Sequence, residues 1–267
     1  MNYKEICEKV CETAKQAGAF IRGERAVFSE DKIEKKGKTD LVSYVDKTAE
    51  QLIVKQLAEI LPDAGFITEE GAVKQEIKEH VWIVDPLDGT TNFTRNISPF
   101  AVSIALMHKN EIVVGVIYEI TRDELFHTYQ NADSYLNNSK IQVSDNSKFE
   151  ESIFITGFPY SDFSNTEGSL ELLNKLIRNS LGIRRLGSAA TDLAYVAAGR
   201  AECFYEDTLN PWDVAAGVLL VKNAGGMVSD YSGGNDYLFG KSILATNKKI
   251  HNNFLDLSKE YLKHISC

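Results

Sequence analysis

The run WIVDPLDGTTN, which begins at Trp82, holds the residues whose types and spacing are best suited to chemistry. In it an apolar strand ends in Asp85, Pro86 stiffens the following turn, and Asp88 comes three residues after Asp85, so both carboxylates can converge on one point. Hard divalent cations such as Mg²⁺ prefer oxygen ligands of this kind in near-octahedral geometry. The run therefore predicts a site for Mg²⁺.

A phosphate site is predicted next to this metal site. Gly89, Thr90 and Thr91 directly follow Asp88 and indicate the start of a short helix. The first N–H groups of a helix are free and carry a partial positive charge, and glycine allows a ligand to approach closely. The alternative is an ordinary turn in which Asp88 and Gly89 only accommodate a positive φ. The flanking strand and helix signals favour metal and phosphate bound side by side.

Three further groups of acids are ambiguous when each is taken alone. Glu69 and Glu70 end another short strand, and such a pair in a loop is usually solvated surface. Asp40 and Asp46 stand at the two ends of a strand-like segment, and Asp46 suits a helix N-cap as well as it suits catalysis. Asp213 lies at the start of a strongly apolar helix, where an acid can simply complement the helix dipole.

The composition is that of a globular protein, with 267 residues of which 43% are hydrophobic and 25% charged, so disordered and low-complexity chains are excluded. The formal net charge of −9 argues against nucleic acid or an anionic membrane as a partner. The longest apolar run, 214–221, is too short to span a bilayer, and no signal-peptide pattern opens the chain. We therefore expect a cytoplasmic protein that holds any anionic substrate locally.

The cysteines do not form a recognisable metal motif. Neither a C-x-x-C pair nor a zinc-type cysteine and histidine spacing occurs among Cys7, Cys11, Cys203 and Cys267. Cys7 and Cys11 stand four residues apart on an expected helix. We interpret them as two small apolar side chains rather than as a bridge or a metal clamp.

The elements that must position these residues follow from hydrophobic periodicity. The first half predicts two helices followed by a sheet: helices 3–24 and 46–61; strands 65–68, 81–85, 99–107, 111–119 and 124–129. Between the two helices, the polar segment 32–38 is predicted to be a mobile excursion. The second half alternates strands and helices: strands 152–156, 183–185, 201–206, 226–230 and 242–246; helices 168–180, 189–198, 212–224 and one from 249.

The change from helices followed by a sheet to alternating strands and helices predicts an α/β (α+β) chain with two subdomains in one compact unit. The first, 1–145, would carry most of the metal ligands, and the second, 146–267, would complete the active site.

The order of four motifs resembles the inositol monophosphatase family of the lithium-sensitive, Mg²⁺-dependent phosphatase superfamily. The motifs are EEG at 69–71, WIVDPLDGTTNF at 82–93, NPWDVAAG at 210–217 and NAGG at 223–226. The match extends over nearly the whole chain, from the lysine-rich loop and Asp40 to Asp46 through to Asn247. The resemblance implies a five-layer αβαβα sandwich of the sugar phosphatase type, a homodimer, and hydrolysis of small phosphate monoesters.

The resemblance also implies roles for individual residues. Two or three Mg²⁺ ions would be held by Glu69, Asp85, the carbonyl of Leu87, Asp88 and Asp213. Thr90 would hydrogen-bond the attacking water, with Asp46 orienting Thr90 and Glu69 assisting catalysis. Two neighbouring metal ions lower the pKa of bound water and neutralise phosphoryl charge.

Substrate contacts are implied for a larger set: Asp88, Gly89, Thr90, Thr91, Gly187, Ser188, Ala189, Glu206 and Asp213. Glu206 matches the position that binds inositol hydroxyls in the family, and a carboxylate there favours a phosphorylated polyol, with inositol 1-phosphate as the expected substrate. Whether Lys35 or Lys36 reaches the phosphate stays open.

Other substrates of the superfamily also stay open: a 3′(2′),5′-bisphosphate nucleotide, fructose 1,6-bisphosphate or histidinol phosphate. The alternative from a different class is a non-catalytic, metal-binding interaction protein.

Overall fold

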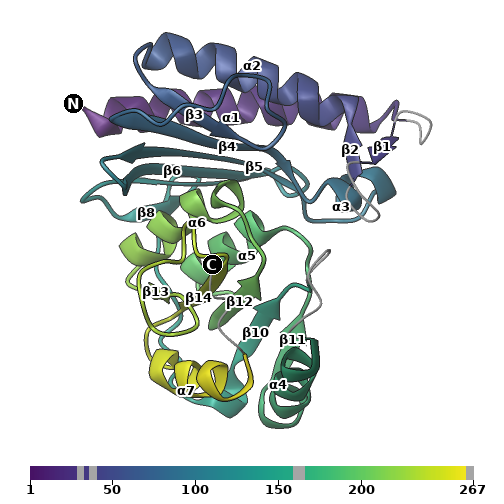
Figure 1. Cartoon of the computed structure of the whole chain (residues 1–267), viewed down its shortest axis with the longest axis vertical. Coiled ribbons are helices and arrows are strands. Elements are labelled where there is room, and N and C mark those ends of the chain that lie inside the picture. Colours follow the sequence, from purple (N-terminus) through teal and green to yellow (C-terminus); the bar gives the residue numbers. More distant parts are fainter. Residues whose placement is uncertain (29–32, 36–40, 159–165, 263–267) are drawn as a thin grey trace.

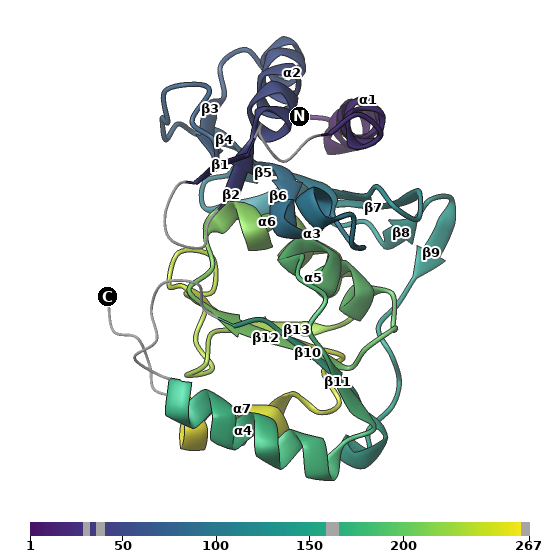
Figure 2. The ribbon, with the colours of Figure 1, turned by 90° about the vertical axis from the view of Figure 1, so that its right-hand side faces the viewer.

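The computed structural model describes residues 1–28, 33–35, 41–158 and 166–262. Five layers alternate between helices and sheets, as Figures 1 and 2 show: a helix pair, a sheet, a second helix pair, a second sheet and a third helix pair. The helices are α1 (Tyr3–Arg25), α2 (Tyr44–Ile60), α3 (Thr90–Arg95), α4 (Thr166–Asn179), α5 (Ala189–Ala197), α6 (Pro211–Asn223) and α7 (His251–Tyr261). The αβαβα sandwich expected from the resemblance is confirmed.

The first sheet contains seven strands in sequence order, β3-β4-β5-β6-β7-β8-β9. Only β3 and β4 run parallel; the other neighbours are antiparallel. Its strands are β3 (Gly65–Thr68), β4 (His80–Asp88), β5 (Ala101–His108), β6 (Glu111–Glu119), β7 (Glu124–Tyr129), β8 (Ser134–Leu136) and β9 (Ser139–Ile141).

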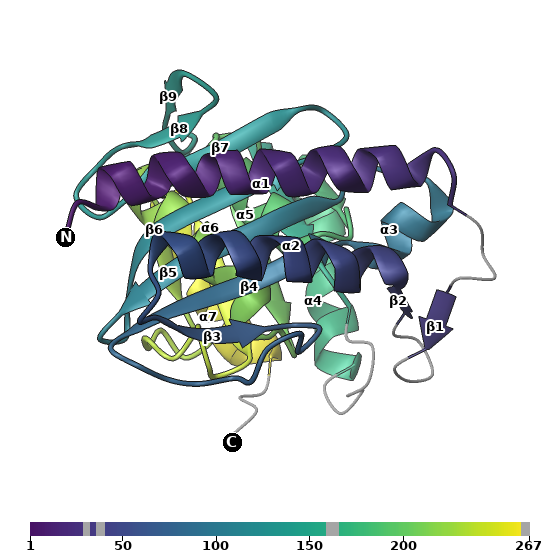
Figure 3. The same ribbon diagram turned by 90° about the horizontal axis from the view of Figure 1, so that it is seen from above.

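Helices cover both faces of this sheet, which explains why β4 is apolar almost throughout rather than alternating. Trp82 and Val84 belong to the core formed with α1 and α2. Val81 and Ile83 belong to the core formed with α5 and α6. Figure 3 shows α1 and α2 lying side by side across the outer face of the sheet.

The second sheet contains five strands in the order β11-β10-β12-β14-β13. The strands are β10 (Ile153–Thr156), β11 (Gly182–Arg184), β12 (Cys203–Asp207), β13 (Met227–Ser229) and β14 (Ser242–Thr246). A third core, which includes Phe154, Tyr205 and Phe254, lies between this sheet and the pair α4 and α7. A single 3₁₀ turn, η2 (Phe149–Glu151), precedes β10.

The pair α5 and α6 lies between the two sheets and therefore has no solvent-facing stripe. Eight consecutive residues of α6, 214–221, are buried. The close packing of α6 on α5 requires glycine at position 217, because a Cβ there would approach the Leu193 Cβ of α5 to 2.4 Å. No described helix has the length and apolar character needed to span a membrane.

Most of the expected elements form within a few residues of their predicted bounds, and three expectations need correction. The segment 32–38 is not only an excursion, because β1 (Ile33–Lys35) pairs antiparallel with β2 (Leu41–Ser43); the remainder of that segment lies outside the described residues. The strand expected to start at 99 starts at Ala101, after a cis Ser98–Pro99 peptide bond. The short pair β8 and β9 was not expected at all. The division into subdomains at 145 stays a prediction.

Candidate active site

The end of β4 and the start of α3 form the centre of the candidate site. The pairing of β4 with β5 shifts register between Asp85 and Asp88, so an irregular stretch re-aims the two acids. The Leu87 N–H donates to Asp85 Oδ1 over 2.9 Å, which fixes that carboxylate. Gly89 is the N-cap of α3 with a φ of 90°, and a Cβ there would lie 3.1 Å from the carbonyl oxygens of Gly187 and Pro99. The turn therefore requires glycine for its conformation and for its space.

The structure brings together the acids that the sequence scatters over more than a hundred residues. Carboxylate oxygens of Asp85, Asp88 and Asp213 all lie within 4.8 Å of one another. The carboxyl of Glu69, directly after β3, is close enough to hydrogen-bond that of Asp85. Asp85 is 2% exposed, whereas Asp88 and Asp213 are half-buried. Asp85, Asp88 and Asp213 thus surround one point at the end of β4, and Glu69 adjoins it through Asp85.

Asp213 reaches this point from the first turn of α6. It is the N3 residue of a capping box, and its Oδ2 accepts from the Asn210 N–H over 2.6 Å. The dipole role considered for this acid and a ligand role are therefore compatible, because the carboxylate that completes the capping box also places an oxygen in the cluster.

Negative charge dominates the cluster, although the charge of Arg185 acts to lower the pKa of Asp88 and that of Lys241 acts to lower the pKa of Asp213. Burial, followed by the charges of Glu69, Asp88 and Asp213, raises the pKa of Asp85 well above its usual value. Burial raises the pKa of Asp88 to about 6, against the hydrogen bonds from Ser188 and the Ala190 amide. Burial and the charge of Asp88 raise the pKa of Asp213 to about 8. A hard divalent cation bound to these oxygens would offset both the cost of burying the charges and the repulsion between them, so the donor set fits Mg²⁺.

Thr90 and Asp46 meet beside the cluster. The Thr90 hydroxyl lies 2.8 Å from Asp46 Oδ1 and 3.1 Å from the Leu87 carbonyl oxygen. Asp46 is fully buried, and burial raises its pKa against the hydrogen bonds from Ser43 and Thr90 that lower it. The N-cap interpretation of Asp46 is wrong: Ser43 is the N-cap of α2, and Asp46 is the N3 residue that completes the capping box.

The segment 187–190, which leads into α5, contacts the site at Asp88. Ser188, the N-cap of α5, donates to Asp88 Oδ2 over 2.6 Å, and the Ala190 N–H donates to the same oxygen over 2.7 Å. Gly187, with a φ of 90°, precedes them, and Ala189 is the first residue of α5. Thr91 is exposed on α3. Of the two candidate lysines, Lys36 lies outside the described residues, and only the backbone of Lys35 is described.

Glu206 lies in β12, near enough to the cluster for its charge to act on Asp213. Burial raises its pKa to about 8, and the charge of Asp88 contributes to that shift, while Arg185 opposes it. A Cβ at Gly157 would overlap the Glu206 carboxylate, so the glycine provides the space in which this side chain lies. Next to it, Asp192 is 1% exposed, and its Oδ1 has no hydrogen-bond partner among the described residues. This side of the site therefore offers carboxyl groups rather than an apolar surface.

Sequence reasoning missed Glu50, which supports the Glu69 loop. Glu50 is fully buried in α2; its Oε1 accepts from the Thr68 hydroxyl over 3.0 Å and from the Ala72 N–H over 2.5 Å, and its Oε2 accepts from the Glu70 N–H over 2.7 Å. The sequence did contain a sign of this role, because Glu50 lies on the apolar face of the helix, three residues before Ile53 and seven before Leu57. A buried acid must be hydrogen-bonded, so its position predicted partners.

Asn92 was also missed. Its side-chain amide donates to the Pro99 carbonyl over 2.7 Å and to the Leu186 carbonyl over 2.8 Å. It thereby connects α3 to Leu186, which directly precedes the segment 187–190 in the other half of the chain. The sequence feature that could have indicated this role is the position of Asn92 within the central motif.

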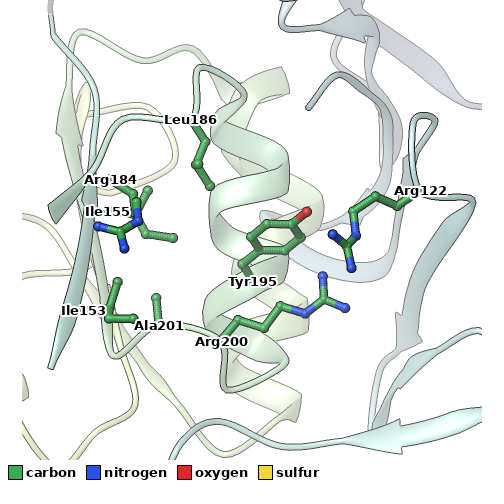
Figure 4. Close-up of a pocket in the computed structure, with 8 residues that line it drawn as sticks. All are labelled: Arg122, Ile153, Ile155, Arg184, Leu186, Tyr195, Arg200 and Ala201. Carbon is green, nitrogen blue, oxygen red and sulfur yellow. The ribbon is translucent and has the colours of Figure 1, made fainter. Parts of the chain in front are cut away.

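A separate pocket of about 240 Å³ lies beside α5, where Arg122, Arg184, Arg200 and Tyr195 line it (Figure 4). Arg200 forms two hydrogen bonds with Glu124, of 2.6 and 2.7 Å, and Arg122 lies 3.3 Å from the same carboxylate. The pocket contains none of the acids of the candidate active site.

Comparisons with known proteins agree with this arrangement. A sequence profile of the inositol monophosphatase family matches residues 2–263. The inositol-1-monophosphatase of Mesorhizobium japonicum is 41% identical over 252 residues, or 94% of this chain and 95% of that protein. The Nus factor SuhB of Escherichia coli is 39% identical over 238 residues, or 89% of each. The crystal structure of extragenic suppressor protein suhB from Bartonella henselae superposes with a TM-score of 0.89 at 39% identity, covering 96% of this chain and 99% of that one.

The layered fold and these matches define an enzyme that hydrolyses phosphoric monoesters. The chain belongs to the inositol monophosphatase family.

Proposed function

We propose that the protein hydrolyses inositol 1-phosphate to inositol and phosphate in a Mg²⁺-dependent reaction. The observation that carries this proposal is the convergence of Asp85, Asp88 and Asp213 within 4.8 Å, beside the start of α3. Glu69, Asp85, Asp88, Asp213 and the Leu87 carbonyl would hold Mg²⁺. When bound, Mg²⁺ lowers the pKa of a water molecule and neutralises charge on the phosphoryl group and the leaving oxygen.

The chain's own residues position the water and the phosphate. Thr90 donates its hydroxyl proton to Asp46, which leaves an oxygen lone pair that can accept a hydrogen bond from the attacking water. The N–H groups of Gly89 and Thr90, at the start of α3, have no acceptor within the helix and are suited to the phosphate oxygens. Positioning and charge stabilisation supply most of the rate enhancement in phosphoryl transfer.

Glu206 supports a polyol as the alcohol part of the substrate. Its carboxyl group can hydrogen-bond several ring hydroxyls, and Gly157 gives it room. Ser188 and Ala189 would line the same side. An apolar or aromatic surface on which a nucleobase could stack does not occur among these residues.

The test is phosphate release by purified protein with and without Mg²⁺, using inositol 1-phosphate, fructose 1,6-bisphosphate, 3′-phosphoadenosine 5′-phosphate, histidinol phosphate and NADP. We expect Mg²⁺-dependent release with the highest kcat/KM for inositol 1-phosphate. Faster release from another ester would support phosphatase activity but would contradict inositol 1-phosphate as the preferred substrate. The expected homodimer and cytoplasmic location stay predictions, and sedimentation tests the dimer.

A second candidate is a non-catalytic role in a macromolecular complex, which the name of the E. coli relative, Nus factor SuhB, favours. The assay above separates the two candidates. Absence of release from every ester, with Mg²⁺ bound, would favour the interaction role.

A further inference from the structure

Two thiols and an imidazole meet at a place remote from the carboxylate cluster. Cys7 and Cys11 lie one turn apart on α1, with 2% and 8% of each residue exposed, and both belong to the core against the first sheet. His127 reaches them from β7 and is half-buried. One ligand atom from each of the three residues lies within 4.8 Å of the other two. Both cysteines are small core residues, as the sequence predicted, and an imidazole lies beside them.

The hydrogen bonding of His127 leaves one ring nitrogen ready to bind a metal. Nε2 lies 3.0 Å from the Asn137 carbonyl oxygen. A carbonyl only accepts, so Nε2 must carry the hydrogen, and in a neutral ring Nδ1 keeps its lone pair. The ring also stacks on Tyr135, with centroids 5.5 Å apart. Metal-binding histidines are typically held in this way, by a backbone carbonyl on the other nitrogen.

The spacing and charge of the cluster suit Zn²⁺. With Zn–S bonds of about 2.3 Å and tetrahedral angles, two sulfur ligands stand about 3.8 Å apart, so a cluster within 4.8 Å needs only a small closure. Thiolate and imidazole select zinc over magnesium. Two thiolates balance the charge of Zn²⁺, and a neutral group costs less to bury than a charged one.

We propose that Cys7, Cys11 and His127 bind one Zn²⁺ ion, with a fourth position open to water. Binding displaces the two thiol protons to solvent, including the one that Cys7 donates to the Thr128 carbonyl at 3.6 Å. The first turns of α1 lie at the end of the sheet opposite to α3, as Figure 3 shows. The site is therefore separate from the proposed catalytic centre and independent of the phosphatase activity.

Cobalt provides a direct test, because a thiolate bound to Co²⁺ gives a near-ultraviolet charge-transfer band that carboxylate ligands do not give. The full-length protein is reduced, freed of metal and titrated with Co²⁺ in excess Mg²⁺, which occupies the carboxylate cluster. Cys7→Ser and Cys11→Ser remove one ligand each. Cys203→Ser, at a buried thiol on β12 in the other sheet, is the matched control. Circular dichroism and Mg²⁺-dependent phosphate release check that each variant is folded.

We expect one equivalent of Co²⁺ to produce the band in the wild type and in Cys203→Ser, and Zn²⁺ to abolish it. Cys7→Ser and Cys11→Ser should lose the band, and His127→Gln should weaken Zn²⁺ binding about 10-fold or more in competition with a chromophoric chelator. No band in the reduced wild type, or a band that survives in both cysteine variants, would overturn the proposal. The His127 variant keeps the test decisive if a cysteine variant fails to fold.

Discussion

At the scale of single residues, the candidate site concentrates negative charge where burial makes charge costly. The charge of Asp88 raises the pKa of Asp85 and of Asp213, and their hydrogen-bond donors are backbone amides and one serine. Such an arrangement destabilises the empty protein and is stabilised by a cation. The same residues therefore determine both activity and stability.

Asp88→Asn should abolish most of the activity while the fold remains. The substitution removes a charged metal ligand but little volume, and Asn can still accept from Ser188 and Ala190. We expect kcat/KM to fall about 100-fold or more, since a bound metal supplies several kcal/mol of charge stabilisation. Asp63→Asn, at an exposed acid, is the matched control and should leave phosphate release unchanged. Wild-type kinetics in Asp88→Asn would show that Asp88 is not a ligand.

Thr90→Ala should reduce kcat by about 100-fold with a smaller change in KM, because the hydroxyl acts on the attacking water and a misplaced group has an effect of this size. Thr90→Ser retains the hydroxyl that bonds Asp46 and should stay close to wild type. Steady-state kinetics of both variants measure the difference. A loss confined to KM would contradict this role for Thr90.

At the scale of elements, strand and helix ends place the acids, and buried polar residues hold those ends in position. Glu50 of α2 accepts two backbone N–H groups and one hydroxyl from the segment 68–72, which contains Glu69. It acts through the loop rather than on the substrate, so it is a positioning residue.

Glu50→Gln leaves at least one of these N–H groups facing an amide instead of an acceptor, and Glu69 should then be less well placed. We expect the Mg²⁺ concentration for half-maximal activity to rise about 10-fold or more, as is usual when the support of a ligand is lost, with less effect on kcat at saturating Mg²⁺. Glu59→Gln, exposed on the same helix, is the control. An unchanged Mg²⁺ requirement would contradict the proposed role of Glu50 in positioning Glu69.

Sequence patterns predicted the long periodic elements well, because α1 and α2 each bury one stripe of apolar residues against the sheet. They also predicted the strand, turn and helix around Asp85 and Asp88. They failed for β1, β8 and β9, which are three residues long and partly exposed or polar, so pairing rather than periodicity defines them. The role of Ser43 as N-cap was missed because the apolar pattern does not show which of two polar residues three positions apart begins a helix.

At the scale of the whole molecule, the resemblance rather than periodicity predicted that Glu69, Asp85 and Asp213 meet. Local patterns cannot show contacts between residues so far apart in the chain. The middle pair α5 and α6, buried against both sheets, brings Asp213 and Ser188 to the end of β4. The binding of metal should therefore couple the first sheet to the middle helix pair.

The stability of the metal-free protein should fall as pH rises. In the unfolded chain aspartates titrate near pH 4, about 3.9, whereas the folded pKa values of Asp88 and Asp213 are about 6 and about 8. The folded state thus binds more protons between these limits, and the unfolding free energy decreases from about pH 4 to about pH 8. Mg²⁺ should raise Tm more at pH 8.5 than at pH 5.5, where protons compete for the carboxylates. Equal Mg²⁺ shifts at the two pH values would contradict this prediction.

The central claim is that Glu69, Asp85, Asp88 and Asp213 hold shared divalent ions beside the start of α3. Anomalous diffraction from crystals soaked in Mn²⁺, a stand-in for Mg²⁺, tests it most directly. We predict at least one strong anomalous peak between Asp85 and Asp88, within coordination distance of Asp213 or Glu69. An enzyme that is active with Mn²⁺ but shows no peak among these four carboxylates would contradict the account.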